Sequence, residues 1–190
     1  GGILVDATPA QMLGSGTFWL LEIWFLLVST AGVMVIGHVV PMAVELGIAQ
    51  ATAVLAMGVL SLANGAGRLA YGALSDRLGR PPAMVVGALL MSLAIFSAIP
   101  LTQRVGITGL LVAVALIGSS YGSGVPLTTA MIIQFFGGKH FGLNLGITSC
   151  QIAVGGLLGP QLAGFLRTNT GAYQAAFALI GTLTLLACLM

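Results

Sequence analysis

The chain has 190 residues, of which 58% are hydrophobic and only 5% are charged, with a formal net charge of +2. Soluble domains carry about 25% charged residues, so this composition excludes an ordinary water-exposed surface. The basic residues are scattered singly, which argues against a nucleic-acid partner. Cys150 and Cys188 lie apart in apolar stretches, so they indicate neither a disulfide framework nor a metal site.

Six apolar segments follow a mixed stretch over residues 1–17, which we interpret as a cytoplasmic linker. Each segment is near the ~20 residues that a helix needs to cross a ~30 Å hydrocarbon layer. The sequence therefore predicts an all-α membrane protein whose residues 18–190 form a six-helix bundle, with the last helix cut off at Met190. The predicted segments are 18–40, 51–74, 83–100, 107–136, 141–166 and 174–190.

Two titratable side chains lie in the first segment. His38, close to its end, could titrate near neutral pH and serve a proton-coupled step, or it could be a packed or interfacial residue. Glu22 is an acid within the crossing, near its start. It too could couple a proton, or it could simply lie at the membrane interface.

Arg68 lies inside the second segment, where an arginine is costly to place in hydrocarbon. Asn64 precedes it by four residues, so the amide can orient the guanidinium on one helix face. The planar fork of donors suits a carboxylate, and we therefore expect solute contact. The alternative is that Arg68 reaches out to the nearer interface. The same polar face includes Ser61, Gly65, Gly72 and Ser75.

The fourth segment contains Gly122, Gly124 and Pro126 among polar residues, which predicts a softened helix. Tyr121 in this stretch could supply a hydroxyl to a cavity or could be a packing aromatic. Ser120 sits in a Gly-x-Ser-x-Gly pattern typical of hydrolase nucleophiles. An intramembrane serine protease is therefore an alternative hypothesis.

That protease would need a histidine close to the serine. His38 lies near the end of its segment and His140 lies in a loop, whereas Ser120 is in mid-segment. The positions therefore favour a protein that is not an enzyme.

The fifth segment carries a polar stripe, Asn144, Thr148, Gln151 and Gly155, spaced four, three and four residues apart. Such a stripe must face protein or water, because lipid cannot satisfy it. Two hypotheses stay open, solute lining and hydrogen bonding between helices. The pairs Gly142/Gly146 and Gly155/Gly159 form Gly-x-x-x-Gly motifs, which let two backbones approach closely.

The turn after the second segment reads Gly72-Ala-Leu-Ser-Asp76-Arg77-Leu-Gly79-Arg80. It resembles the signature loop of the major facilitator superfamily, Gly-x-x-x-Asp-Arg-x-Gly-Arg. The preceding Asn64-Gly-Ala-Gly-Arg68 is similar to helix eight of the oxalate/formate antiporter and monocarboxylate porter branch. The likeness covers nearly the whole chain, as helices seven to twelve of a twelve-helix carrier.

This resemblance implies that Arg68 binds a substrate carboxylate and that the signature loop latches two six-helix halves. Oxalate carriers of the branch pair the arginine with a lysine on helix eleven. Here Gln151 and Ile152 lie near that position, so we expect a monocarboxylate rather than oxalate. Asn64, Tyr121, Asn144, Thr148 and Gln151 are the other expected substrate contacts, and Gly72, Asp76, Arg77, Gly79 and Arg80 form the expected gating loop.

We therefore expect half of a secondary transporter that moves a small organic anion by exchange or proton coupling, without metal or cofactor. The expected partner is a missing amino-terminal six-helix half, and the expected location is a bacterial inner membrane. Arg77, Arg80 and Lys139 lie on one side and Arg104 and Arg167 on the other. This bias favours a cytoplasmic signature loop. A membrane scaffold without a solute is the remaining alternative.

Overall fold

The computed structural model describes residues 6–189. Over these residues the chain is helical, and the predicted all-α architecture is confirmed. Five stretches are long and apolar enough to cross a membrane, with α5 and α6 forming one of them, and α8 with η1 adds a shorter apolar segment. The elements are α1 (Pro9–Leu13), α2 (Gly16–Glu45), α3 (Gln50–Leu78), α4 (Arg80–Val105), α5 (Ile107–Gly122), α6 (Gly124–Phe136), α7 (Phe141–Thr170), α8 (Gln174–Leu186) and η1 (Ala187–Leu189).

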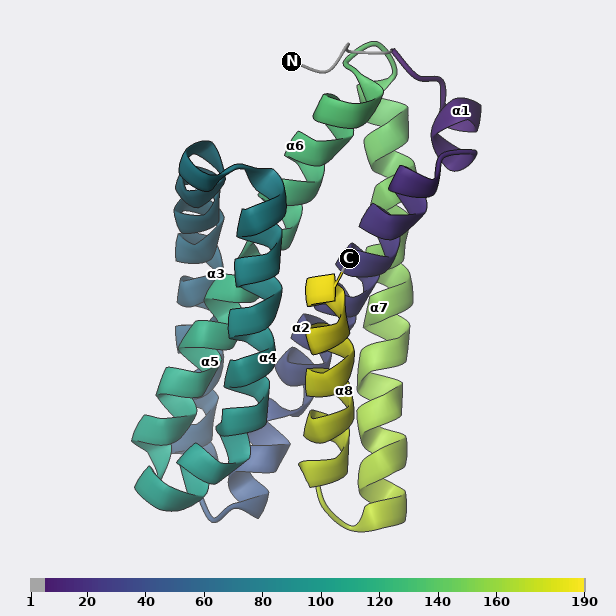
Figure 1. Cartoon of the computed structure of the whole chain (residues 1–190). Helices are drawn as coiled ribbons and strands as arrows, with labels where there is room; N and C mark the ends of the chain where they lie inside the picture. The colour runs from purple at the N-terminus through teal and green to yellow at the C-terminus, as the bar shows by residue number, and fades with distance from the viewer. Residues whose placement is uncertain (1–5, 190) are drawn as a thin grey trace.

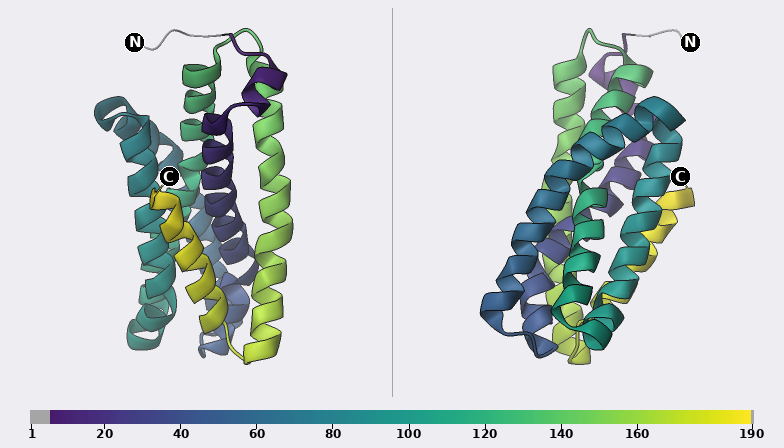
Figure 2. Two further views of the ribbon diagram at one scale, coloured as in Figure 1. Left: turned by 45° about the vertical axis from the view of Figure 1, so that its right-hand side comes forward. Right: turned by 90° about the vertical axis from the view of Figure 1, so that its left-hand side faces the viewer.

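The helices run up and down, so their turns alternate between the two ends of the bundle (Figures 1 and 2). The α3–α4 and α6–α7 turns share one end with α1, and the α2–α3, α4–α5 and α7–α8 turns share the other. We call the first the signature end and the second the opposite end. At the signature end the backbone N–H of Ala7 donates to the Phe136 carbonyl over 2.9 Å, which ties the start of the described chain to α6.

The first crossing is longer than predicted. The sequence places its end at Val40, before Pro41, but α2 continues through Pro41 to Glu45. A proline inside a helix removes one backbone donor, and membrane helices tolerate this where neighbouring groups satisfy the freed carbonyl. Within the predicted linker, Thr8 caps the short helix α1 by accepting from the backbone N–H of Gln11.

The fourth crossing is broken in its middle, as its glycines and proline predict. α5 ends at Gly122 and α6 begins at Gly124, with Ser123 between them. The Ser123 hydroxyl donates to the Ser120 carbonyl over 2.6 Å, which satisfies an acceptor at the break. Pro126 then lies in the first turn of α6, where its missing N–H is tolerated. The break places polar side chains at mid-bundle.

Helix packing brings the second and fourth crossings together. α5 lies between α3 and α4, α7 runs along α2, and α8 covers α4 (Figures 1 and 2). Gly122 of α5 faces the Asn64 carbonyl of α3 so closely that a Cβ atom there would overlap it. Small residues at crossings let helices associate by close contact in lipid, and this crossing holds Arg68 beside the α5–α6 break.

Candidate functional site

Arg68 lies in a small cavity between α2, α3, the α5–α6 break and α7. Asn64 and Tyr121, both predicted beside it, line the same cavity, whose volume is about 40 Å³. One water needs about 10–15 Å³ of such volume, so the cavity holds a few waters and is too small for a whole organic anion. The remaining lining residues are Phe25, Ser29, Gly122, Val125 and Ile152.

The guanidinium of Arg68 stays open to a ligand. The Arg68 residue is exposed, and within residues 6–189 no carboxylate forms an ion pair with it. Tyr121 is half-buried, with its ring packed on Gly32 of α2 so that a Cβ at that glycine would overlap it. Tyr121 therefore both packs between helices and lines the cavity.

Gln151 borders the cavity through Ser29. The Ser29 hydroxyl donates to Gln151 Oε1 over 2.6 Å, which links α2 to α7. Gln151 is 4% exposed, and its Nε2 is buried without a hydrogen-bond partner among the described residues. Ile152, the next residue, lines the cavity and is 39% exposed. Of the two residues near the expected lysine position, Ile152 therefore lines the cavity and Gln151 borders it.

Asn144 and Thr148 lie elsewhere on α7, outside the Arg68 cavity. Both are fully buried, on the face of α7 that also carries Gly155 and Gly159. The Asn144 amide donates to the Ala7 carbonyl over 3.2 Å, and a Cβ at Gly155 would overlap the Ser29 hydroxyl of α2. In this structure the stripe is therefore a buried packing face, which meets α2 at Gln151 and Gly155 and residue Ala7 at Asn144. The other predicted motif, Gly142 and Gly146, has open space around it.

The signature turn is compact. Gly79 separates α3 from α4 with φ of +89°, a left-handed conformation that favours glycine. Asp76 and Arg77 are exposed in the last turn of α3. Arg80 donates to Gln134 Oε1 of α6 over 2.6 Å, a partner that sequence reasoning did not find. Gly72 lies within α3, where its carbonyl accepts from the Ser75 hydroxyl.

His38 is bound at both ring nitrogens. Its Nε2 lies 3.1 Å from the Pro160 carbonyl and its Nδ1 lies 3.2 Å from the Tyr173 hydroxyl. A carbonyl can only accept, so Nε2 carries the proton and the tyrosine donates to Nδ1 in the neutral ring. His38 thereby joins α2, α7 and the α7–α8 turn.

An ion pair lies beside this histidine at the opposite end. Arg167 donates to Glu45 Oε2 from both Nε and an Nη, each over 3.2 Å, and its guanidinium carbon lies 5.8 Å from the centroid of the Tyr173 ring. Burial raises the pKa of Tyr173 above its usual value, while nearby Arg167 lowers it. The chain therefore contains a second arginine that is already neutralised by a carboxylate.

Glu22, the other candidate for proton coupling, is half-buried on α2. Its Oε2 is buried and has no hydrogen-bond partner within the described residues. The carboxyl thus differs from Glu45, whose oxygen accepts twice from Arg167.

Ser120, the candidate nucleophile of the protease alternative, is buried and lies 3.2 Å from the Tyr71 hydroxyl. In the described part of the chain no histidine hydrogen-bonds to it, and His38 is bound elsewhere. A serine hydrolase needs a base within hydrogen-bond reach of the nucleophile. The geometry therefore gives the protease hypothesis no support.

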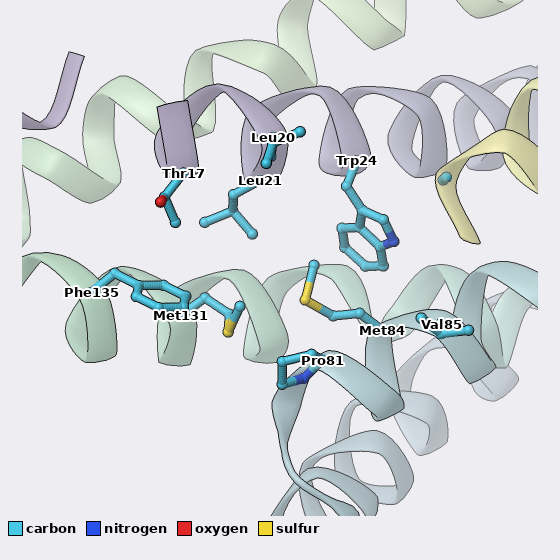
Figure 3. A pocket seen from close by; sticks show the side chains of 10 residues that line it. Thr17, Leu20, Leu21, Trp24, Pro81, Met84, Val85, Met131 and Phe135 are labelled. Atoms are coloured by element: carbon cyan, nitrogen blue, oxygen red, sulfur yellow. The ribbon is translucent and has the colours of Figure 1, made fainter. Parts of the chain in front are cut away.

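A second pocket lies nearer the signature end, between α2, α4 and α6, and its volume is about 250 Å³. Figure 3 shows Leu21 and Trp24 of α2 pointing toward the side of the pocket formed by Met131 of α6 and Met84 of α4. Among the described residues, no charged side chain lines it, and its side-chain donors are the Thr17 hydroxyl and the Trp24 indole N–H. The described lining therefore offers no cation to balance an organic anion in a low-dielectric site.

Sequence reasoning found three cavity residues and missed Ser29 and Phe25 of α2. Ser29 and Thr30 form a polar pair inside an otherwise apolar run, and this signal could have identified the face of α2 that turns toward α7. Phe25 gives no such signal, because one phenylalanine in a membrane helix is equally suited to lipid or to protein.

Known proteins resemble this chain over most of its length. The family model of the Major Facilitator Superfamily matches residues 23–190. The chain is 33% identical to human monocarboxylate transporter 11 over 78% of this chain and 33% of that protein. It is 26% identical to the oxalate:formate antiporter of Oxalobacter formigenes, over 90% of this chain and 41% of that protein. It is 30% identical to rat monocarboxylate transporter 13, over 94% and 42% respectively. The chain thus spans about a third to two fifths of the length of these relatives.

Proposed function

The chain belongs to the Major Facilitator Superfamily, and on that premise we propose that it is the carboxyl-terminal six-helix half of a secondary carrier for a small organic anion. The carrier works by alternating access, in which one six-helix bundle rocks against another around a site near mid-membrane. The amino-terminal half supplies the rest of the cavity wall, and the protein lies in a bacterial inner membrane as a multi-pass integral protein.

The observation that carries this proposal is the state of Arg68. Its guanidinium stands on a membrane helix, shares a cavity with Asn64 and Tyr121, and forms no ion pair with a carboxylate of residues 6–189. A lone cation in a low-dielectric site is costly unless an anion visits it. The fork of donors suits the two oxygens of a carboxylate.

The solute we propose is a monocarboxylate. The described lining of the cavity contributes one cation, Arg68, and includes the apolar Ile152. Gln151 and Ile152 lie near the position where the resemblance implies a lysine in oxalate carriers. A dianion would leave one of its carboxylates without a charged partner at this wall. The names of the relatives, which include monocarboxylate transporters and an oxalate:formate antiporter, fit a carboxylate cargo.

The signature loop is the moving joint of this proposal. Asp76 and Arg77 are exposed at the end of α3, where they can pair with the other half in one conformation and separate in the other. Arg80 anchors the start of α4 to α6 through Gln134. The loop would thereby couple α3, which carries Arg68, to the gap between the halves.

The test is counterflow of radiolabelled pyruvate into proteoliposomes that contain the intact carrier. We expect Arg68→Lys to raise the half-saturating pyruvate concentration by about tenfold or more, since lysine keeps the charge but cannot reproduce the bidentate fork. Arg167→Lys is the matched control, because that arginine is paired with Glu45, and it should retain normal affinity. Unchanged pyruvate affinity in Arg68→Lys would remove Arg68 from the site.

A further inference from the structure

Glu22 is a carboxyl inside a membrane helix without a partner for its buried oxygen. It lies six residues into α2, roughly 9 Å along the axis at ~1.5 Å per residue. An acidic side chain that merely reaches the headgroups keeps its oxygens in water. Glu22 Oε2 is buried instead, and no donor of the described residues contacts it. The interfacial interpretation therefore does not fit this side chain.

Helical spacing connects Glu22 to the Arg68 cavity. Residues 22, 25 and 29 lie on one face of α2, since they are separated by three and four residues. Phe25 and Ser29 of this face line the cavity of Arg68. Glu22 stands about one turn closer to the signature end, and it lies nearly half a turn around α2 from most of the α2 residues that line the apolar pocket of Figure 3.

The same face of α2 lies against α6 and α7. Phe25 packs on Gly124 of α6, where a Cβ would come within 2.6 Å of the ring, and Ser29 bonds to Gln151 of α7. Both neighbouring helices also carry polar atoms that are buried without a described partner, namely Thr128 Oγ1, Asn144 Oδ1 and Gln151 Nε2. Such atoms need water or another polar group, so this contact can solvate a proton between the cavity and the signature end.

Few charged groups can neutralise Glu22. The helices α1, α6 and α8 contain no ionisable side chain, α5 contains only Tyr121, and η1 contains Cys188. On α4 the ionisable residues are Arg80, which donates to Gln134 of α6, and Arg104, which lies in the last turn at the opposite end. On α7 the ionisable residues are Cys150, which is exposed, and Arg167, which pairs with Glu45 at the opposite end. On α3 they are Arg68, Tyr71, Asp76 and Arg77.

Of the α3 groups, Arg68 is the cation at the cavity. Tyr71 is bonded to Ser120, and Asp76 and Arg77 are exposed in the last turn of the helix. In the described part of the molecule, Glu22 is thus an acid and Arg68 a cation on two helices that line one cavity, and neither has an ion-pair partner. His38 cannot play the same part as readily, because both its ring nitrogens are already bonded.

We propose that Glu22 carries the proton that moves with the organic anion, an inference that rests on the proposed function. In the empty carrier the Glu22 carboxylate takes a proton from water, which removes a negative charge about one helical turn from the cavity-lining Phe25. The anion then binds Arg68. After the carrier opens to the other side, the anion leaves and Glu22 releases its proton to water. One proton and one monoanion cross together, so the step moves no net charge.

Two transport modes of the intact carrier in proteoliposomes test this role. Uptake of labelled pyruvate into pyruvate-free vesicles, driven by an inward proton gradient, requires the coupled proton. Counterflow against unlabelled pyruvate at equal pH requires only the anion site. We expect Glu22→Gln to lower gradient-driven uptake about tenfold or more while counterflow stays within about twofold of wild type. Glu45→Gln, an acid on the same helix, is the control and should keep both modes.

The outcomes separate this inference from the proposed function. Two outcomes overturn the role of Glu22 without contradicting the proposed anion transport. In one, gradient-driven uptake survives in Glu22→Gln. In the other, the wild-type carrier shows counterflow but no response to the proton gradient. Wild-type vesicles that show no counterflow with pyruvate, formate or oxalate overturn both.

A second variant covers poor insertion of Glu22→Gln. Glu22→Asp keeps an ionisable group but moves it, so we expect a shifted pH at half-maximal gradient-driven uptake with unchanged counterflow. An unchanged pH profile in Glu22→Asp overturns the inference.

Discussion

Two arginines on membrane helices, Arg68 within α3 and Arg167 near the end of α7, have opposite electrostatic surroundings. Arg167, at the opposite end, donates twice to Glu45 and lies against the Tyr173 ring. Arg68, on α3, shares a cavity with Asn64 and Tyr121 and has no carboxylate partner among residues 6–189. The residue type is the same, but one charge is balanced by the fold and the other is not. The proposed anion site therefore depends on the unbalanced charge of Arg68, and not on the mere presence of an arginine.

Replacing each arginine by alanine should give the largest difference in pyruvate counterflow. In Arg68→Ala we expect pyruvate counterflow to fall about 10- to 100-fold, because hydrogen bonds to charged groups contribute about 1.5–3 kcal/mol. In Arg167→Ala we expect a change of about twofold or less, because exposed pairs contribute about 0–1 kcal/mol. The measurement is counterflow normalised to carrier abundance. Equal losses in both variants would contradict the distinction.

The next largest effect is expected on stability, at the close contact between α3 and α5 beside Arg68. Gly122→Ala adds a methyl group against the Asn64 carbonyl, and we expect a loss of about 1–3 kcal/mol of stability from overpacking. Gly142→Ala on α7 has nothing within 4 Å of the added atom and should leave stability nearly unchanged. Thermal unfolding of the purified protein in detergent compares them. If Gly122→Ala unfolds at the same temperature as Gly142→Ala, the close crossing of α3 and α5 is wrong.

Several residues that line the Arg68 cavity could be predicted from sequence, because spacing along a helix fixes which residues share a face. Asn64 and Arg68 follow from their separation of four, and the break near Tyr121 follows from the glycines and proline around it. The direction of the α7 stripe could not be predicted. Asn144 and Gln151 satisfy the same physical requirement against a protein helix or against water, so the rotation of α7 depends on tertiary packing.

The same limit applies to the first crossing. Pro41 predicts a helix end from local chemistry, yet α2 continues to Glu45, since tertiary neighbours outweigh one lost backbone bond. The pairing of Glu45 with Arg167 joins two turns that are 122 residues apart, and no local pattern encodes it.

A second cation at the cavity should change the selectivity between a monoanion and a dianion. Ile152 lines the cavity opposite the Arg68 helix, and Ile152→Lys would place an ammonium near the guanidinium. We expect the preference for oxalate over pyruvate to increase by about tenfold, because each carboxylate of a dianion then has a cation. Competition of unlabelled oxalate against pyruvate counterflow measures this, and Leu157→Lys, on an exposed part of α7, is the control. An unchanged oxalate preference would show that residue 152 lies outside the anion site.

The smallest effect is expected at the opposite end of the bundle, where Arg167 is paired with Glu45. Glu45→Gln removes the partner of Arg167, whose side chain is 50% exposed, so the unfolding temperature should change by no more than about 2 °C. The change should be visible locally instead. Glu45 raises the pKa of Tyr173 and Arg167 lowers it, while burial is the largest cause of the raised value. Removing Glu45 should therefore lower the Tyr173 pKa, although burial keeps it above its usual range. Alkaline ultraviolet titration, taken as a difference from Tyr173→Phe, measures this, and a rise in that pKa would contradict the arrangement of charges at this end.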